Sequence, residues 1–191
     1  MSSHTDEEIA KRVQTGDIES FGVLVERYEE KLTRYARRFL FYAEEAEDII
    51  QDVFMKAYAN IRSFDATRKF SSWIYRIAHN ECINAMKKRG KEAIPFFDPD
   101  TLFPHPVAKE TADEGIRREE LKALMEGNLE RLDPKYREPL ILFYYEEMDY
   151  KEIAEILRIP VSTVGVRLNR ARAAIKSRMQ NEGEELYAYE R

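Results

Sequence analysis

Apolar residues recur at intervals of three and four along the N-terminal half of the chain, the spacing that gathers side chains on one face of an α-helix. Polar and charged residues fill the positions between them, so each helix has one face for a core and one for solvent. Strict alternation of apolar and polar residues, which is typical of strands, is not seen. The pattern predicts helices over residues 9–13, 21–40, 44–61 and 71–89.

Short polar stretches separate these helices. Gly16-Asp17 interrupts the first run, and the Asp17 carboxylate is a candidate cap for the helix that follows. Ser71 or Ser72 is the candidate cap for the last helix of this half. The residues from Arg62 to Phe70 are expected to form the loop that leads into it.

Proline changes the character of the chain between residues 93 and 115. Pro95, Pro99, Pro104 and Pro106 each fix the backbone and remove a hydrogen-bond donor, so no long helix fits there. We interpret this stretch as a linker.

A second set of helices follows the linker. The first is expected to end at Asp133-Pro134, a second continues from Pro139, and two more are expected at 150–157 and from Ser162 to about Met179. The fold class predicted is therefore all-α. Its parts are a domain at 1–92, an irregular acidic linker at 93–115, a second domain at 116–181 and a frayed tail at 182–191.

The distribution of charge points to nucleic acid although the net charge is −5. Residues 62–91 carry eight basic side chains against two acidic ones, and residues 158–178 carry six against none. The linker between these blocks is acidic. Basic clusters attract phosphates locally, whatever the total charge. For either block taken alone, a solvated helix face is the alternative.

The sequence gives little support to an enzyme or a metal centre. Cys82 is the only cysteine, and we expect it to be buried. His4, His79 and His105 are scattered, with no spacing typical of metal ligands, and no glycine-rich phosphate loop occurs. We therefore expect no catalytic residue, no metal and no cofactor. With no signal-peptide pattern and no apolar run of about 20 residues, we also expect a cytoplasmic protein without membrane insertion.

Residues 149–178 have the form of a helix-turn-helix. Ile153, Ala154 and Leu157 mark the apolar face of a short helix, Ile159-Pro160-Val161 makes a turn, and Ser162 or Thr163 is the candidate cap of the second helix. In this motif the second helix enters the major groove of DNA. An ordinary packed pair of helices is the alternative.

Four segments of the chain carry further motifs. Ala46 to Phe54, followed by Lys56-Ala-Tyr58, looks like the polymerase-binding helix of region 2 of bacterial RNA polymerase sigma factors. Phe70 to Ala78 with Asn80 resembles the adjoining segment that opens the −10 promoter element. Leu132 to Arg137 and Tyr150 to Arg172 look like region 4. The match is to the extracytoplasmic-function (ECF) group, and it covers both predicted domains.

The resemblance implies three sets of functional residues. Those expected to bind core polymerase, at its large clamp subunit, are Asp48, Ile49, Gln51, Asp52, Phe54 and Lys56. Those expected to bind the −10 element and the melted non-template strand are Asn60, Phe64, Lys69, Trp73, Arg76, Asn80, Lys87 and Lys88. Those expected to bind the −35 duplex are Ser162, Thr163, Val166, Arg167, Asn169, Arg170 and Arg172.

Alternatives remain for each set. The acidic side of the 44–61 helix could be solvated only, and Trp73 could equally be a core residue. Gly165 and Val166 stand where the family commonly carries basic or polar side chains, which makes the −35 sequence preference harder to predict.

The resemblance also implies further partners. The polymerase flap is expected to contact region 4, the linker would thread the RNA exit channel, and an anti-sigma factor is possible. A plain spacer is the alternative for the linker. A conventional repressor or activator that uses only its helix-turn-helix is the rival function, and it would bind duplex DNA without polymerase.

Overall fold

The computed structural model describes residues 4–40, 45–90, 125 and 127–189, with the backbone alone described over 179–189. Within these residues every regular element is a helix, which confirms the predicted fold class. The chain divides into two compact units, one of residues 1–93 with 155–158 and the other of the remaining residues. The name second unit is used below for all described residues from 125 onward. The predicted linker at 93–115 and the first residues of the predicted second domain lie outside the described residues.

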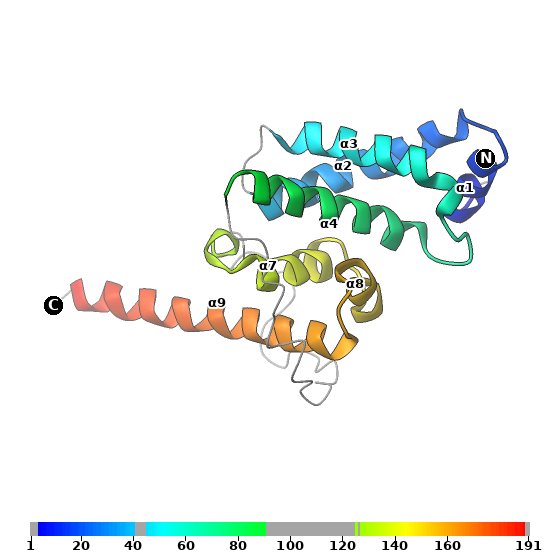
Figure 1. The fold of residues 1–191 in the computed structure, drawn as a ribbon. Helices are drawn as coiled ribbons and strands as arrows, with labels where there is room; N and C mark the ends of the chain where they lie inside the picture. The colour runs from blue at the N-terminus through cyan, green and yellow to red at the C-terminus, as the bar shows by residue number, and fades with distance from the viewer. Residues whose placement is uncertain (1–3, 41–44, 91–124, 126, 190–191) are drawn as a thin grey trace. The chain divides into compact units, whose positions relative to one another are not determined.

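The first unit is a bundle of helices in which α2, α3 and α4 pack against one another (Figure 1). The short helix α1 packs against α2 and α4. The core is aromatic and aliphatic, and Tyr35, Phe39 and Tyr75 are among its largest fully buried side chains. Its elements are α1 (Asp6–Gln14), α2 (Ser20–Leu40), α3 (Ala46–Asn60), the 3-10 turn η2 (Ile61–Ser63) and α4 (Phe70–Lys88).

Helix starts in this unit follow the sequence in part. Asp17 accepts hydrogen bonds from the backbone N–H and the hydroxyl of Ser20, so it holds the start of α2 as predicted. The prediction of a serine cap on α4 is wrong. The helix begins at Phe70 after Lys69, which makes no side-chain cap, and Ser72 is buried inside the first turn.

In the second unit, the described residues form a 3-10 turn, two short helices, a π-helical turn and the long α9. The predicted helix that runs up to Asp133 is wrong in its last part, because residues 127–128 form a turn before the 3-10 segment. Asp133-Pro134 begins a helix rather than ending one, since the Asp133 carboxylate accepts from Lys135 N–H at 2.9 Å. The elements are η3 (Leu129–Arg131), α7 (Pro134–Leu140), the π-helical η4 (Ile141–Tyr145), α8 (Tyr150–Leu157) and α9 (Val161–Tyr189).

The predicted helix-turn-helix is present as α8 and α9. Arg158 follows α8 in the left-handed region at φ 54°, and the N–H of Ile159 reaches back to the carbonyl of Ala154 at 3.1 Å. This is the hydrogen bond of a Schellman motif, which ends α8 and turns the chain. Helix α9 begins at Val161, so neither predicted cap residue precedes it. It continues to Tyr189, over residues for which a frayed tail was expected.

No helix in the described part of the chain combines the length and the apolar composition that a membrane span requires.

Candidate polymerase and nucleic-acid interfaces

Helix α3 exposes a polar stripe along its length. Asp48, Gln51 and Asp52 are all exposed, and the spacing of three and four places them on one side of the helix. Met55 continues the same stripe one turn later and is 63% exposed. Sequence reasoning missed Met55, although its spacing from Asp48 and Asp52 was available as a signal. The stripe thus joins carboxylates and an amide to one exposed apolar side chain.

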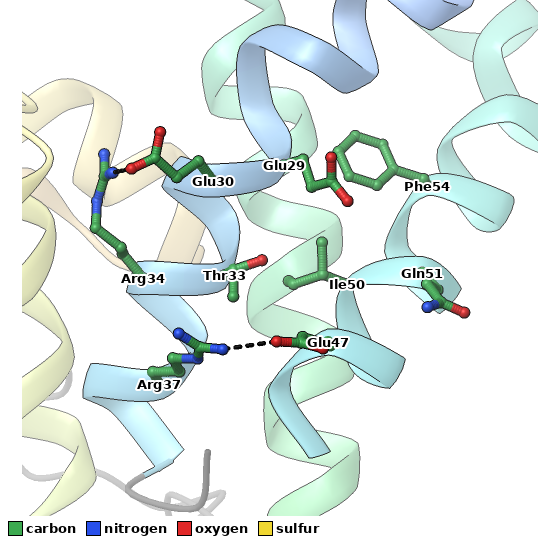
Figure 2. Close-up of a pocket in the computed structure, with 9 residues that line it drawn as sticks. All are labelled: Glu29, Glu30, Thr33, Arg34, Arg37, Glu47, Ile50, Gln51 and Phe54. Atoms are coloured by element: carbon green, nitrogen blue, oxygen red, sulfur yellow. Dashed lines mark hydrogen bonds and ion pairs between the residues drawn. The ribbon is translucent and has the colours of Figure 1, made fainter. Parts of the chain in front are cut away.

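A groove runs between α2 and α3 beside this stripe (Figure 2). Ile50 and Phe54 line it from α3, and Phe54 itself is almost completely buried. Arg37 of α2 donates to the carboxylate of Glu47 at 2.7 Å, which ties the two helices together. Phe54 is therefore placed to form an apolar wall for a partner rather than to project into it.

A second groove lies between α3 and α4. Ile49, Asp48 and Asp52 line it from α3, and Lys88 is among the residues that line it from α4. Lys56 was expected to contact polymerase. Its amine donates to Glu81 of α4 at 2.5 Å, so the side chain also joins α3 to α4. Of the six residues expected at the polymerase interface, four are exposed, while Ile49 and Phe54 line the flanking grooves.

Helix α4 carries a basic stripe. Arg76, Asn80 and Lys87 are separated by four and seven residues, so they lie on one face. Asn80 and Lys87 are exposed, and Arg76 is half-buried. Lys88 is exposed next to Lys87, and Lys69 is exposed just before the helix begins. Two ordinary phosphate-binding groups thus flank an amide that could bind a base edge.

Asn60 also belongs to the predicted −10 set. It is exposed at the end of α3, where its side-chain amide donates to the carbonyl of Lys56 at 2.8 Å. One of its amide hydrogens is therefore used within its own helix.

Phe64, which was expected to bind the −10 element, is buried. It is 4% exposed, and the 3-10 turn before it folds its ring onto those of Phe70 and Trp73, with centroids 5.4 and 5.2 Å away. Trp73 is 8% exposed and belongs to the same cluster, so it is a core residue. Trp73 and Asn80 lie on the same face of α4. Phe64 of the loop before α4 packs on Trp73, whereas Asn80 is exposed.

The loop after Phe64 is ordered by its own side chains. Asp65 accepts hydrogen bonds from the backbone N–H and the hydroxyl of Thr67, at 3.0 and 2.8 Å. These two bonds hold the pKa of the Asp65 carboxyl below its ordinary value. Asp65, Thr67, Arg68 and Lys69 are all exposed. The loop is thus a preformed turn whose polar side chains face solvent.

On α9 the structure divides the predicted −35 set. Asn169 and Arg170 are exposed, and Ser162 and Val166 are half-buried. Thr163 and Arg167, which were expected to contact −35 DNA, are only 1% and 3% exposed. Each immediately precedes a residue of the apolar face, Val164 or Leu168, and so lies at the edge of the core.

Arg172 is used inside the second unit. Its Nε donates to the hydroxyl of Tyr144 at 2.8 Å, and its Nη1 donates to the amide oxygen of Asn169 at 3.1 Å. The guanidinium also lies over the rings of Phe143 and Tyr144, at 5.8 and 5.5 Å from their centroids. These contacts attach α9 to the π-helical turn.

Among the described residues, no three side chains of His, Cys, Asp and Glu come together in a way that could hold a metal ion.

Comparison with known proteins agrees with this arrangement. Residues 24–92 match the family sigma-70 region 2, and residues 128–175 match sigma-70 region 4. The chain is 36% identical over 179 residues to the ECF RNA polymerase sigma factor SigW of Bacillus subtilis, an alignment that covers 90% of this chain and 95% of SigW. The chain belongs to the ECF RNA polymerase sigma factors. It is therefore a transcription-initiation factor that works with RNA polymerase.

Two solved structures show the same fold. CnrH, solved with the cytosolic domain of CnrY, is 26% identical with a TM-score of 0.67, covering 93% of this chain and 99% of CnrH. RpoE of Bartonella quintana, solved with the anti-sigma factor NepR, is 28% identical with a TM-score of 0.62, covering 84% and 96%. The region 2 match begins within α2, so α1 lies outside it.

Proposed function

We propose that residues 1–92 act as sigma region 2 and residues 116–181 as region 4, and that each surface described above has one task in promoter-specific initiation. The observation that carries the proposal is the division of labour on the first unit. Its α3 presents carboxylates and an amide, whereas its α4 presents basic side chains and an amide. A protein needs both kinds of surface if it binds a protein and a nucleic acid at once.

The α3 stripe is the proposed polymerase interface. Asp48, Gln51 and Asp52 would contact the coiled coil of the large clamp subunit, with Met55 supplying apolar contact area at the end of the stripe. Exposed methionine adapts its shape to a partner at little cost. Ile49 and Phe54 would form the walls on either side of the bound segment.

The α4 stripe and the Asp65–Lys69 turn are the proposed −10 interface. Opening of a duplex exposes a single strand, whose phosphates would bind Lys69, Arg76 and the Lys87-Lys88 pair. Asn80 would hydrogen-bond an unstacked base, because an amide offers both a donor and acceptors. Phe64 and Trp73 would shape this surface from below, since both rings are buried.

The first half of α9 is the proposed −35 reader. Asn169 and Arg170 would make the polar contacts, with Val166 placed to touch a thymine methyl and Ser162 near the backbone. Thr163, Arg167 and Arg172 would support the helix rather than read sequence. Region 4 would also contact the polymerase flap.

The same surfaces suit an inhibitory partner. Two relatives were solved with a bound partner, CnrH with CnrY and RpoE with NepR. We propose that an anti-sigma factor of this kind would cover the α3 and α4 faces. When no such partner is bound, the protein would act at the nucleoid in the cytoplasm. It would act there as a binding subunit, without a catalytic residue or a cofactor of its own.

Binding of promoter duplex with and without core polymerase tests this function against the rival of a conventional regulator. Fluorescence anisotropy would be measured on fragments selected by the protein and core together. We expect tight, sequence-specific binding only when core polymerase is present. Equal affinity for the same fragments without core polymerase would favour the regulator and contradict the proposal.

A further inference from the structure

Helix α1 contacts both ends of the turn that connects α3 to α4. At the near end, the side-chain amide nitrogen of Gln14 donates to the carbonyl of Ile61 at 2.8 Å and to that of Phe64 at 2.7 Å. The first acceptor belongs to the first residue of η2, and the second belongs to the residue that follows η2. Both amide hydrogens of a single side chain therefore hold the 3-10 turn in which the loop begins.

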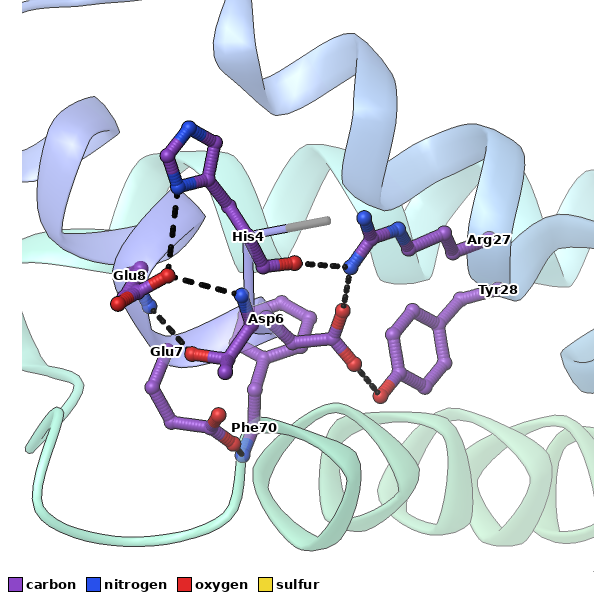
Figure 3. A network of polar contacts seen from close by, with 8 residues as sticks. His4, Asp6, Glu7, Glu8, Arg27, Tyr28 and Phe70 are labelled. Carbon is purple, nitrogen blue, oxygen red and sulfur yellow. Dashed lines mark hydrogen bonds and ion pairs between the residues drawn. The ribbon is translucent and has the colours of Figure 1, made fainter. Parts of the chain in front are cut away.

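At the far end, Glu7 takes the place of a helix cap (Figure 3). Its carboxylate accepts the backbone N–H of Phe70 at 2.9 Å, and Phe70 is the first residue of α4. Lys69, the residue at the N-cap position, makes no cap with its own side chain. A carboxylate at the start of a long helix satisfies an unpaired N–H and interacts favourably with the helix dipole.

Helix α1 is itself fixed to α2. Asp6 accepts from Arg27 and from the hydroxyl of Tyr28, each at 2.5 Å (Figure 3). Burial, and then the hydrogen bond to Asp6, raises the pKa of the Tyr28 hydroxyl above its ordinary value, so it remains a donor. The Tyr28 ring also meets the Phe70 ring edge-on at 5.5 Å. Gln14 and Glu7 therefore act from a support anchored on the bundle.

We propose that α1 is a positioning element for single-stranded promoter DNA, and that Gln14 and Glu7 are its positioning residues. They hold the two ends of the Ile61–Phe70 segment so that the Asp65–Lys69 turn is preformed before DNA arrives. A preformed loop binds more tightly because less conformational entropy is lost on binding. This inference rests on the proposed function of that turn. It assigns a role to residues that precede the part of the chain matched to region 2.

The test uses variants that remove single hydrogen bonds and keep side-chain length. Gln14→Met loses both donors, Glu7→Met loses the acceptor, and Glu7→Gln keeps an acceptor oxygen. Lys11→Met is the matched control, because Lys11 is exposed on the same helix. Holoenzyme made from each full-length variant would be titrated with a labelled single strand that carries the −10 segment of a promoter mapped by transcription. Duplex −35 DNA would be titrated in parallel, and hydrogen exchange of residues 61–70 would be measured in the free protein.

We expect Gln14→Met and Glu7→Met to bind the single strand about tenfold more weakly, because the Asp65–Lys69 turn would then lose conformational entropy on binding. Hydrogen exchange in residues 61–70 should become faster in both variants. Binding to −35 duplex should not change, and Glu7→Gln and Lys11→Met should behave as the wild type does.

Wild-type affinity for the single strand in Gln14→Met and Glu7→Met would overturn the inference. Equal losses on single strand and −35 duplex would overturn it too, because they indicate general unfolding. The two proposals can fail separately. If wild-type holoenzyme does not bind the single strand, the proposed function of the turn is wrong, whereas unchanged hydrogen exchange in the variants shows that α1 does not order the loop.

Discussion

Arg172 and Tyr144 are joined twice, once by a hydrogen bond from Nε to the hydroxyl at 2.8 Å and once by the guanidinium lying over the phenol ring. Tyr144 belongs to the π-helical turn η4 and Arg172 to the middle of α9. This pair therefore connects two elements of the second unit. The guanidinium of Arg172 is thus used in a contact within the protein, although Arg172 was expected to bind −35 DNA.

Replacement of Arg172 should affect stability more than DNA recognition. Arg172→Met removes a hydrogen bond and a cation–π contact, so we expect the second unit to unfold with a free energy lower by about 1–2 kcal/mol. Calorimetry would measure the loss. The salt dependence of −35 duplex binding should stay as in the wild type, and a decrease by one phosphate contact would show that Arg172 binds DNA directly.

Replacement of Arg170 should do the opposite. Arg170 is exposed on α9 and donates to the Tyr136 hydroxyl at a long 3.4 Å, so Arg170→Ala should lower the free energy of unfolding less than Arg172→Met does. We expect its −35 duplex affinity to fall and the slope of log K against log salt to decrease by about 1, as for one lost phosphate contact. A salt titration of holoenzyme binding measures both. An unchanged slope together with an unchanged affinity would remove Arg170 from the interface.

Arg158 adopts an unfavourable backbone conformation in the turn of the helix-turn-helix. It has φ 54°, a region in which a side chain costs about 1 kcal/mol and glycine costs nothing. We expect Arg158→Gly to raise the free energy of unfolding of the second unit by about that amount. Arg158→Ala keeps the β-carbon and should give no such gain. Equal effects of the two substitutions in calorimetry would contradict the conformational explanation.

The Asp65 turn should be sensitive to acid. The pKa of Asp65 is lower in the folded protein than in the unfolded chain. Its hydrogen bonds therefore stabilise the turn fully at pH values above the unfolded pKa of about 4. This stabilisation is lost as the pH falls through the lower, folded pKa. We expect the amide resonance of Thr67 to shift in that acid range in the wild type. Asp65→Asn has an acceptor that does not titrate, so its Thr67 resonance should not follow the same curve.

Much of the fold could be predicted from the sequence because helix periodicity is a local signal. The spacing of apolar residues located α2, α3, α4 and α8, and the Gly16-Asp17 step located the start of α2. The cap of α4 could not be found in this way. Its acceptor is Glu7, which lies far away in sequence and reaches Phe70 only when α1 docks.

The sequence predicted which types of residue form the candidate interfaces better than it predicted which of those side chains are exposed. Asp48, Asp52 and Asn80 face solvent as their positions on amphipathic helices suggested. Phe64 is buried for a reason that helix spacing does not contain, because the 3-10 turn before it folds its ring into the bundle. Helix spacing places Arg167 beside the apolar face of α9 but does not show that so long a charged side chain is buried.

Transcription in vitro tests the central claim most directly. Purified protein, bacterial core polymerase and a pool of promoter-length fragments would be mixed, and RNA start sites would be mapped. We predict defined start sites that vanish without the protein. The amount of RNA from these sites should fall about tenfold with Asn80→Ala, and about tenfold with Asp52→Ala when core polymerase is limiting. Glu19→Ala, an exposed acidic residue outside both grooves, should behave as the wild type does. The claim is contradicted if several bacterial core polymerases fail to initiate while the protein alone binds specific duplexes.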